Sequence, residues 1–282
     1  MFTECIFDPH GLGLKGAIGH ANGPPVVFLH GVLRGWRDFA PLYPAVQPRW
    51  QPMAVDFRGH GQSARAAGKY RVIDYVDDAL AVLANLGEPA VVYGHSLGAL
   101  TAAAAAAKAP KSVRALVLED PPSANLLNHF SQSKFVSQFT AMKILAGDSV
   151  PIPELTRRLA TIPLTGPGGA MLKLGDLRDA ASLRFLARCL KDVDPEVLTP
   201  LNADRWLEGC EIETIMRHVK CPAMILRGDE AKGGMLGREE AEQWAAWMSD
   251  TMLIDVPTGH LIHWMETETT IRLLLSFLES LR

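Results

Sequence analysis

The sequence lacks the features that mark disulfide-rich, zinc-binding or membrane-spanning proteins. Its four cysteines are scattered, without the C-x-x-C spacing of a zinc site or the pattern of a disulfide framework. No apolar stretch approaches the roughly 18 residues that a membrane span needs, and the opening MFTECIFDPH has no signal-peptide pattern. We therefore expect reduced thiols, no membrane span and a cytoplasmic location.

The sequence also lacks an excess of either positive or negative charge. Lys and Arg number 28, Asp and Glu number 31, and the net charge is −3. No run of five like charges occurs, and a dedicated nucleic-acid binder would usually be basic, so no nucleic-acid partner is expected. With 282 residues, 48% of them hydrophobic, the chain is long and apolar enough for one large globular domain, with or without an insertion. The oligomeric state leaves no signal in the sequence.

Short apolar runs alternate with helical patterns along most of the chain, after a hairpin predicted within residues 1–20. The predicted strands are 26–30, 53–57, 90–93, 113–119, 223–226 and 252–256, and the predicted helices are 71–86, 98–109, 238–248 and 267–281. Such alternation is typical of an α/β fold whose mostly parallel sheet has helices on both faces.

Residues 122–217 interrupt this alternation. They show no clear strand, many helical patterns, and several prolines and glycines. A linker would be more polar and less aromatic, so this stretch is interpreted as a helical insertion between two strands of the sheet. The core then consists of residues 1–121 and 218–282.

The pentapeptide GHSLG, residues 94–98, carries the strongest chemical signal. It directly follows a predicted strand and directly precedes an alanine-rich helix, which is the setting of a nucleophile elbow. The glycines allow a sharp turn that lifts the serine hydroxyl out of the sheet at a helix N-terminus, where negative charge is favoured. The motif therefore predicts that Ser96 is an exposed nucleophile.

Together with LHG at 29–31, DFRGHGQS at 56–63 and PTGHLIHWMETE at 257–268, this elbow resembles the α/β-hydrolase superfamily. The resemblance covers both parts of the core, and it covers the insertion in position only, where the superfamily commonly carries a helical cap. It implies acyl transfer to serine on a small molecule without a cofactor.

Of the nine histidines, His260 is the candidate general base, because it follows the last predicted strand and the superfamily order is Ser, acid, His. His263 is predicted to pack or to form hydrogen bonds. His30 and His60 lie in superfamily motifs and resemble structural turn residues. No histidines and carboxylates are spaced as ligands, so no metal is predicted.

The identity of the acid that would orient His260 stays open. At the commoner superfamily position, after the penultimate predicted strand, the residue in register is Ala231, and Asp229 lies off register. The alternative superfamily position follows strand 113–119 and holds Asp120. We favour Asp120 over Asp229, and the neighbouring glutamates Glu119 and Glu230 remain further alternatives.

The resemblance also implies an oxyanion hole made by the backbone N–H groups of Val32 and Leu97. Trp36, just past this loop, is predicted either to line a substrate pocket or to pack the loop. Arg34 and Arg37 lie beside it. They are consistent with a substrate that bears a carboxylate, and equally with an ordinary solvated surface.

The predicted function is therefore hydrolysis of small carboxylic esters or lactones through an acyl-enzyme on Ser96. Amide, carbon–carbon or peracid chemistry on the same residues remains open, because a fold alone does not choose the reaction. A serine at this position, in place of an aspartate, argues against haloalkane dehalogenation and epoxide hydrolysis. The rival from another class is a ligand receptor that keeps the fold without turnover.

Overall fold

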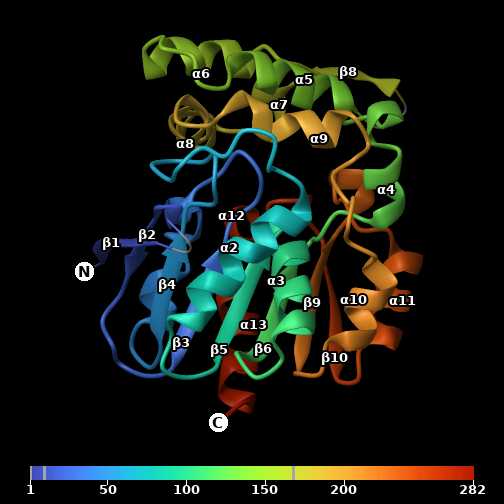
Figure 1. The fold of residues 1–282 in the computed structure, drawn as a ribbon. Coiled ribbons are helices and arrows are strands. Elements are labelled where there is room, and N and C mark those ends of the chain that lie inside the picture. The colour runs from blue at the N-terminus through green and yellow to red at the C-terminus, as the bar shows by residue number, and fades with distance from the viewer. Residues whose placement is uncertain (1, 9–10, 167–168) are drawn as a thin grey trace.

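The computed structural model describes residues 2–8, 11–166 and 169–282 (Figure 1). Eight strands form its main sheet: β1 (Thr3–Phe7), β2 (Leu14–Ile18), β3 (Pro25–Leu29), β4 (Gln51–Val55), β5 (Ala90–His95), β6 (Val113–Glu119), β9 (Ala223–Gly228) and β10 (Thr251–Val256). Their order is β1-β2-β4-β3-β5-β6-β9-β10. The β1–β2 and β2–β4 pairs are antiparallel and the other neighbours are parallel, which confirms the predicted mostly parallel sheet.

The central strands are buried on both faces. Every residue of β3 and β5 is buried, and side chains alternate between two hydrophobic clusters, with Val27 and Leu29 in one and Val26 and Phe28 in the other. Because helices cover both faces, these strands are continuous apolar runs and not alternating ones.

Helices of the core cover both faces of this sheet (Figure 1). The first cluster receives α2 (Val72–Ala84), α3 (Leu97–Lys108), α10 (Ile212–His218) and α11 (Arg238–Trp247). The second receives the 3-10 helix η2 (Trp36–Phe39), α1 (Tyr43–Val46), α12 (Ile262–Met265) and α13 (Thr267–Ser280). The run of alanines in α3 is buried, and these small side chains let the helix lie close to the sheet.

A further layer lies across one end of the sheet, at the top of Figure 1, and comes from the chain between β6 and β9. Its elements are α4 (Ala124–Asn128), α5 (Val136–Leu145), α6 (Ile152–Ala160), β7 (Pro163–Thr165), β8 (Met171–Lys173), α7 (Leu174–Leu177), α8 (Ala180–Lys191) and α9 (Thr199–Asn202), with the 3-10 helices η3 (Phe130–Gln132) and η5 (Pro195–Leu198). Leu155, Leu159, Leu183 and Leu190 join the first hydrophobic cluster, so this layer is packed onto the core.

The expectation that this segment contains no strand is wrong. β7 and β8 form a two-stranded antiparallel sheet, with Leu164 opposite Leu172. Each strand has only three residues, which is too short for an alternating hydrophobic pattern to be recognised.

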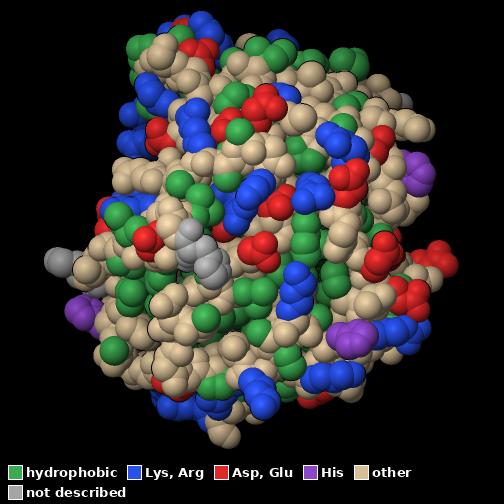
Figure 2. Space-filling model, viewed as in Figure 1, with side chains coloured by type: hydrophobic (Ala, Val, Ile, Leu, Met, Phe, Trp, Pro, Cys, Tyr) green, Lys and Arg blue, Asp and Glu red, His purple; other side chains and the backbone are tan. Residues whose placement is uncertain are grey.

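On the face shown in Figure 2, basic and acidic side chains are interspersed. None of the helices in the described part of the chain combines the length and the hydropathy required to cross a bilayer.

Candidate active site

The turn between β5 and α3 holds Ser96 in an unusual backbone conformation. Its φ is 55° and its ψ is −117°, a region that residues other than glycine rarely adopt. A Cβ at Gly94 would overlap the carbonyl of Gly98, and a Cβ at Gly98 would overlap the carbonyl of Leu29. Both glycines are therefore required by backbone contacts, and the turn directs Ser96 into a cavity.

Asp120 and His260 come from two loops that lie at the same end of the sheet. Asp120 follows β6 and is fully buried. One of its carboxylate oxygens, Oδ2, lies 2.6 Å from Nδ1 of His260, in the loop between β10 and α12. The backbone N–H groups of Gly228 and Met235 donate to Asp120 at 2.9 Å each. These bonds fix the carboxylate, which in turn places the proton of His260 on Nδ1 and leaves Nε2 free to accept one.

The other acids that the sequence left open make different contacts. Asp229 caps the 3-10 helix η6 (Glu230–Lys232), where its Oδ1 accepts from the backbone N–H of Ala231 at 2.9 Å. Glu230 is exposed, with a carboxylate oxygen 3.6 Å from Arg227. Glu119 is bonded to Tyr93 and His263. The structure thus brings Asp120, and none of these three, to His260.

Glu119, next to Asp120 in the chain, belongs to a cluster of buried charged side chains with His263 and Asp38. Nδ1 of His263 is 2.7 Å from Oε1 of Glu119, and its Nε2 is 3.5 Å from Oδ2 of Asp38. Burial alone would lower the pKa of His263, but the negative charges of Glu119 and Asp38 outweigh it and raise the pKa to about 9. Burial would raise the pKa of Glu119, but His263 and His95 lower it to about 2. His263 is therefore a buried imidazolium held between two carboxylates.

We expect His263→Gln to destabilise the fold by about 3–5 kcal/mol, because it leaves the buried carboxylate of Glu119 without its cation and removes one of the two cations beside Asp38. The raised pKa of His263 contributes stability that is full below pH 6.5 and is lost as the pH rises toward 9. In His263→Gln, the free energy of unfolding should not show this decline with pH. Urea unfolding at pH 6 and pH 9 measures both effects, with His218→Gln, at an exposed histidine, as the control. An equal decline in wild type and variant would contradict the assignment.

The two predicted oxyanion donors come from different places: Val32 lies in the loop after β3, and Leu97 is the first residue of α3. In the described residues, the backbone N–H groups of Val32 and Leu97 donate no hydrogen bond to other parts of the chain. At the first position of α3, the N–H group of Leu97 has no acceptor within the helix. The neighbouring N–H of Leu33 donates to Nε2 of His60 at 3.1 Å, and that of Phe57 donates to Nε2 of His30 at 2.9 Å.

His30 and His60 therefore act as acceptors that fasten this loop to the one after β4. Burial lowers the pKa of His30 to about 3 and that of His60 to about 4, so both rings are neutral, as an acceptor nitrogen requires. The structural role expected for these two histidines agrees with these contacts.

Ser96 and His260 line one cavity of about 590 Å³, enclosed by the loops at the end of the sheet and by the layer above it. From that layer, Phe135, Phe139 and Met142 contribute apolar walls. Phe130, in contrast, is buried away from the cavity lining. The described lining therefore brings Ser96 and His260 together with side chains of the segment between β6 and β9, a contact that the sequence alone did not predict.

Arg34, Trp36 and Arg37, the residues expected near the oxyanion loop, lie in three different surroundings. Arg34 lines the cavity. Trp36 packs in the second hydrophobic cluster, with its backbone N–H bonded to Asp56 at 2.7 Å, and is not among the described lining residues. Of the two roles predicted for Trp36, the contacts correspond to loop packing. Arg37 is exposed and pairs with Glu4 at 2.6 Å.

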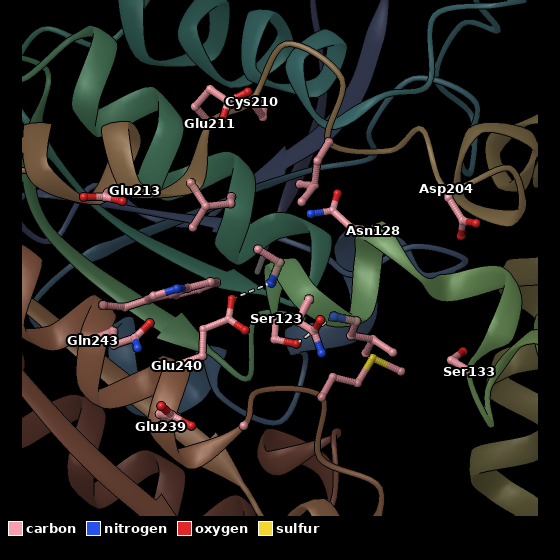
Figure 3. Close-up of a pocket in the computed structure, with 18 of the residues that line it drawn as sticks. Ser123, Asn128, Ser133, Asp204, Cys210, Glu211, Glu213, Glu239, Glu240 and Gln243 are labelled. Atoms are coloured by element: carbon pink, nitrogen blue, oxygen red, sulfur yellow. Dashed lines mark hydrogen bonds between the residues drawn. The ribbon is translucent and has the colours of Figure 1, made fainter.

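A second, larger cavity of about 1080 Å³ lies beside α4 and α11. Figure 3 shows acidic side chains around it, among them Glu211, Glu213, Glu239 and Glu240, and a dashed line marks the bond from the N–H of Ala124 to Glu240. Ser123 lies there, but its hydroxyl accepts from the N–H of Leu126 and caps α4. Neither Ser96 nor His260 lines this cavity.

Metal-binding arrangements are absent from the part of the chain that the structure describes. No group of three or more His, Cys, Asp or Glu side chains there is arranged to hold an ion.

The chain is similar to several known hydrolases. A 2-(acetamidomethylene)succinate hydrolase of Mesorhizobium japonicum is 25% identical over 92% of this chain and 89% of its own length. A pimeloyl-[acyl-carrier protein] methyl ester esterase of Neisseria meningitidis is 27% identical over 77% of this chain and 89% of its own. The crystal structure of an E-2-(acetamidomethylene)succinate hydrolase superposes with a TM-score of 0.78, covering 99% of this chain and 100% of the other at 23% identity, and so shows a shared fold. The model of the alpha/beta hydrolase fold family matches residues 24–267. Because that match spans most of the chain, the protein belongs to the alpha/beta hydrolase family.

Proposed function

We propose that this protein is a serine hydrolase that cleaves small carboxylic esters or lactones through an acyl-enzyme on Ser96. The observation that carries the proposal is the 2.6 Å contact between His260 and the buried Asp120, with His260 and the strained Ser96 lining one cavity. A nucleophile, a base and an acid that orients the base are the parts that such catalysis needs.

In this mechanism, Nε2 of His260 takes the proton from the hydroxyl of Ser96, and the oxygen attacks the carbonyl carbon of the substrate. The N–H groups of Val32 and Leu97 donate to the oxyanion, and His260 gives its proton to the leaving group. Water, deprotonated by His260, then attacks the acyl-enzyme, and the serine leaves with that proton. Each oxyanion donor is worth roughly 2.7–4 kcal/mol in a serine hydrolase.

We also propose that residues 122–217 serve as a helical cap on the core formed by 1–121 and 218–282. The cavity walls support this division, because Phe139 and Leu183 come from that segment while Ser96 and His260 come from the core. A cap of this kind excludes water and selects the substrate by shape. Its apolar walls suit an apolar acyl or alcohol group.

Amide hydrolysis is the second candidate. It is favoured by the likeness, over most of both chains, to a protein named for hydrolysis of an acetamido compound. The same residues perform both reactions, with His260 protonating a nitrogen in place of an oxygen. Rates on an ester and an amide with the same acyl group would rank the two.

A fluorophosphonate probe tests the proposal directly. We expect covalent labelling at neutral pH, mapped to Ser96 by mass spectrometry, because only an activated hydroxyl attacks such a phosphorus centre. Ser123, in the larger cavity, should stay unlabelled in the same sample. Labelling of another residue, or none at all, would contradict the proposal, and the latter result would favour a ligand receptor.

A further inference from the structure

The cavity that contains Ser96 carries an excess of positive charge, although the whole chain has a net charge of −3. Its charged lining residues, other than histidine, are Arg34, Lys134, Arg178, Lys232 and Glu230. The single anion among them, Glu230, already lies near Arg227, at 3.6 Å. The larger cavity has the opposite composition, with many carboxylates and Lys134 as a basic residue. An anionic ligand would be drawn to the first cavity and repelled from the second.

Arg34 is held firmly at one wall of this cavity. Its side chain is buried, its Nε lies 3.2 Å from Oδ1 of Asp38, and its guanidinium lies over the ring of Phe185 at 5.4 Å. Asp38 also accepts a hydrogen bond from the indole N–H of Trp264 and neighbours the cationic His263. The negative charge of Asp38 is therefore shared among several donors, and Arg34 is not neutralised by a carboxylate of its own.

Arg178 approaches from the layer above, at the end of α7. It lines the cavity and is partly buried, yet within the described residues its side chain makes no hydrogen bond or ion pair. Burial and the positive charge of Arg34 lower the pKa of Arg178 to about 10, which still leaves it charged at neutral pH. A guanidinium that shares its cavity with a second cation and lacks a partner is costly, and a bound anion would offset that cost.

We propose that Arg34 and Arg178 form a subsite for a carboxylate of the substrate. This inference rests on the proposed function, and it narrows the substrate to a small acyl compound that also carries a free carboxylate. Two guanidinium groups suit a planar carboxylate because each offers paired N–H donors. Leucine side chains that line the same cavity, such as Leu33 and Leu183, suit a short apolar link between the carboxylate and the scissile carbonyl.

The test compares two esters that differ in one charged group, p-nitrophenyl hydrogen adipate and p-nitrophenyl hexanoate. They share a six-carbon acyl chain, and only the adipate ends in a carboxylate. We expect wild type to favour the adipate in kcat/KM, and Arg178→Gln to reduce that preference by on the order of 10- to 100-fold. Arg178→Lys should retain part of it. Arg37→Gln removes an exposed arginine outside the cavity and should leave the preference unchanged.

A second measurement separates failure of this inference from failure of the proposed function. Adipate, added as a competitor, should slow fluorophosphonate labelling of Ser96, and should do so less in Arg178→Gln. One outcome would overturn the carboxylate subsite alone: Ser96 is labelled and the hexanoate ester is cleaved, but the enzyme does not prefer the adipate ester and free adipate does not slow labelling. Absence of both labelling and cleavage would overturn the proposed function. Calorimetric titration with adipate would then decide the subsite, since binding lost in Arg178→Gln supports it and no binding to wild type overturns it.

Discussion

Ser96→Ala is expected to lower the rate of p-nitrophenyl acetate hydrolysis by on the order of 10⁶, the effect of removing a serine nucleophile from a complete triad. Without the hydroxyl, no acyl-enzyme forms, and His260 has no proton to accept from the protein. The oxyanion donors and the cavity remain, so a small residual rate over water should persist.

The fold should tolerate this change. The strain at position 96 lies in its backbone, with φ at 55°, and alanine has the same Cβ as serine there. Among the described residues the Ser96 hydroxyl has no hydrogen-bond partner, while the backbone N–H donates to the carbonyl of Glu119 at 2.9 Å and would continue to do so. The free energy of unfolding of Ser96→Ala, measured with urea, should therefore lie within about 1 kcal/mol of the wild-type value.

Ser123→Ala is the matched control, because this serine lies in the larger cavity. It should lose the cap of α4, at about 1 kcal/mol of stability, and keep its hydrolytic rate. Retained hydrolysis in Ser96→Ala, or its loss in Ser123→Ala, would move the active site to another place in the molecule.

The second large effect is expected at Asp120. Asp120→Asn should lower kcat by on the order of 10⁴, by analogy with the same change in a serine protease triad. An amide at this position can donate to Nδ1 of His260, which shifts the proton to Nε2 and prevents that nitrogen from accepting the proton of Ser96. The change keeps the size of the side chain and its contact with the N–H of Gly228, but an NH2 group in place of Oδ2 loses the hydrogen bond from the N–H of Met235. Urea unfolding of the variant therefore separates the effect of protonation from a loss of stability.

Asp229→Asn provides a nearly identical change in the neighbouring loop. Asparagine caps a helix about as well as aspartate, so the bond to the N–H of Ala231 should survive and kcat should change little. Steady-state rates of the two variants at neutral pH make the comparison. The assignment of the acid fails if Asp229→Asn is the slower variant, or if neither differs from wild type.

Much of the fold could be predicted because its strands and helices leave strong local patterns. β3 is an apolar run that ends shortly before Gly31, and the apolar part of β5 runs directly into Gly94. The motif around Ser96 combines a strand, a turn and a helix within a dozen residues. The position of His260 also follows from local signals, since it occupies a loop between the last strand and the last helices.

The choice of acid depended on three-dimensional contacts that local patterns do not contain. β6 and β9 are neighbours in parallel register, with Glu119 beside Leu226, so Asp120 and Asp229 both emerge at the same edge of the sheet. The backbone of Asp120, with φ at 39°, and the N–H groups of Gly228 and Met235 direct its carboxylate to His260. Arg178 was missed for a related reason, because nothing in its own segment indicates that the chain returns it to Arg34.

The long separation between Ser96 and His260 along the chain also bears on how the protein is made and degraded. During synthesis, a polypeptide that has emerged only as far as β9 contains Ser96, its flanking glycines and Asp120, but it lacks His260. An N-terminal fragment that a protease releases by cutting before β10 lacks the same residue. Under the proposed mechanism, such incomplete chains would be inactive, and hydrolysis would begin only once the segment that carries His260 has folded onto the sheet.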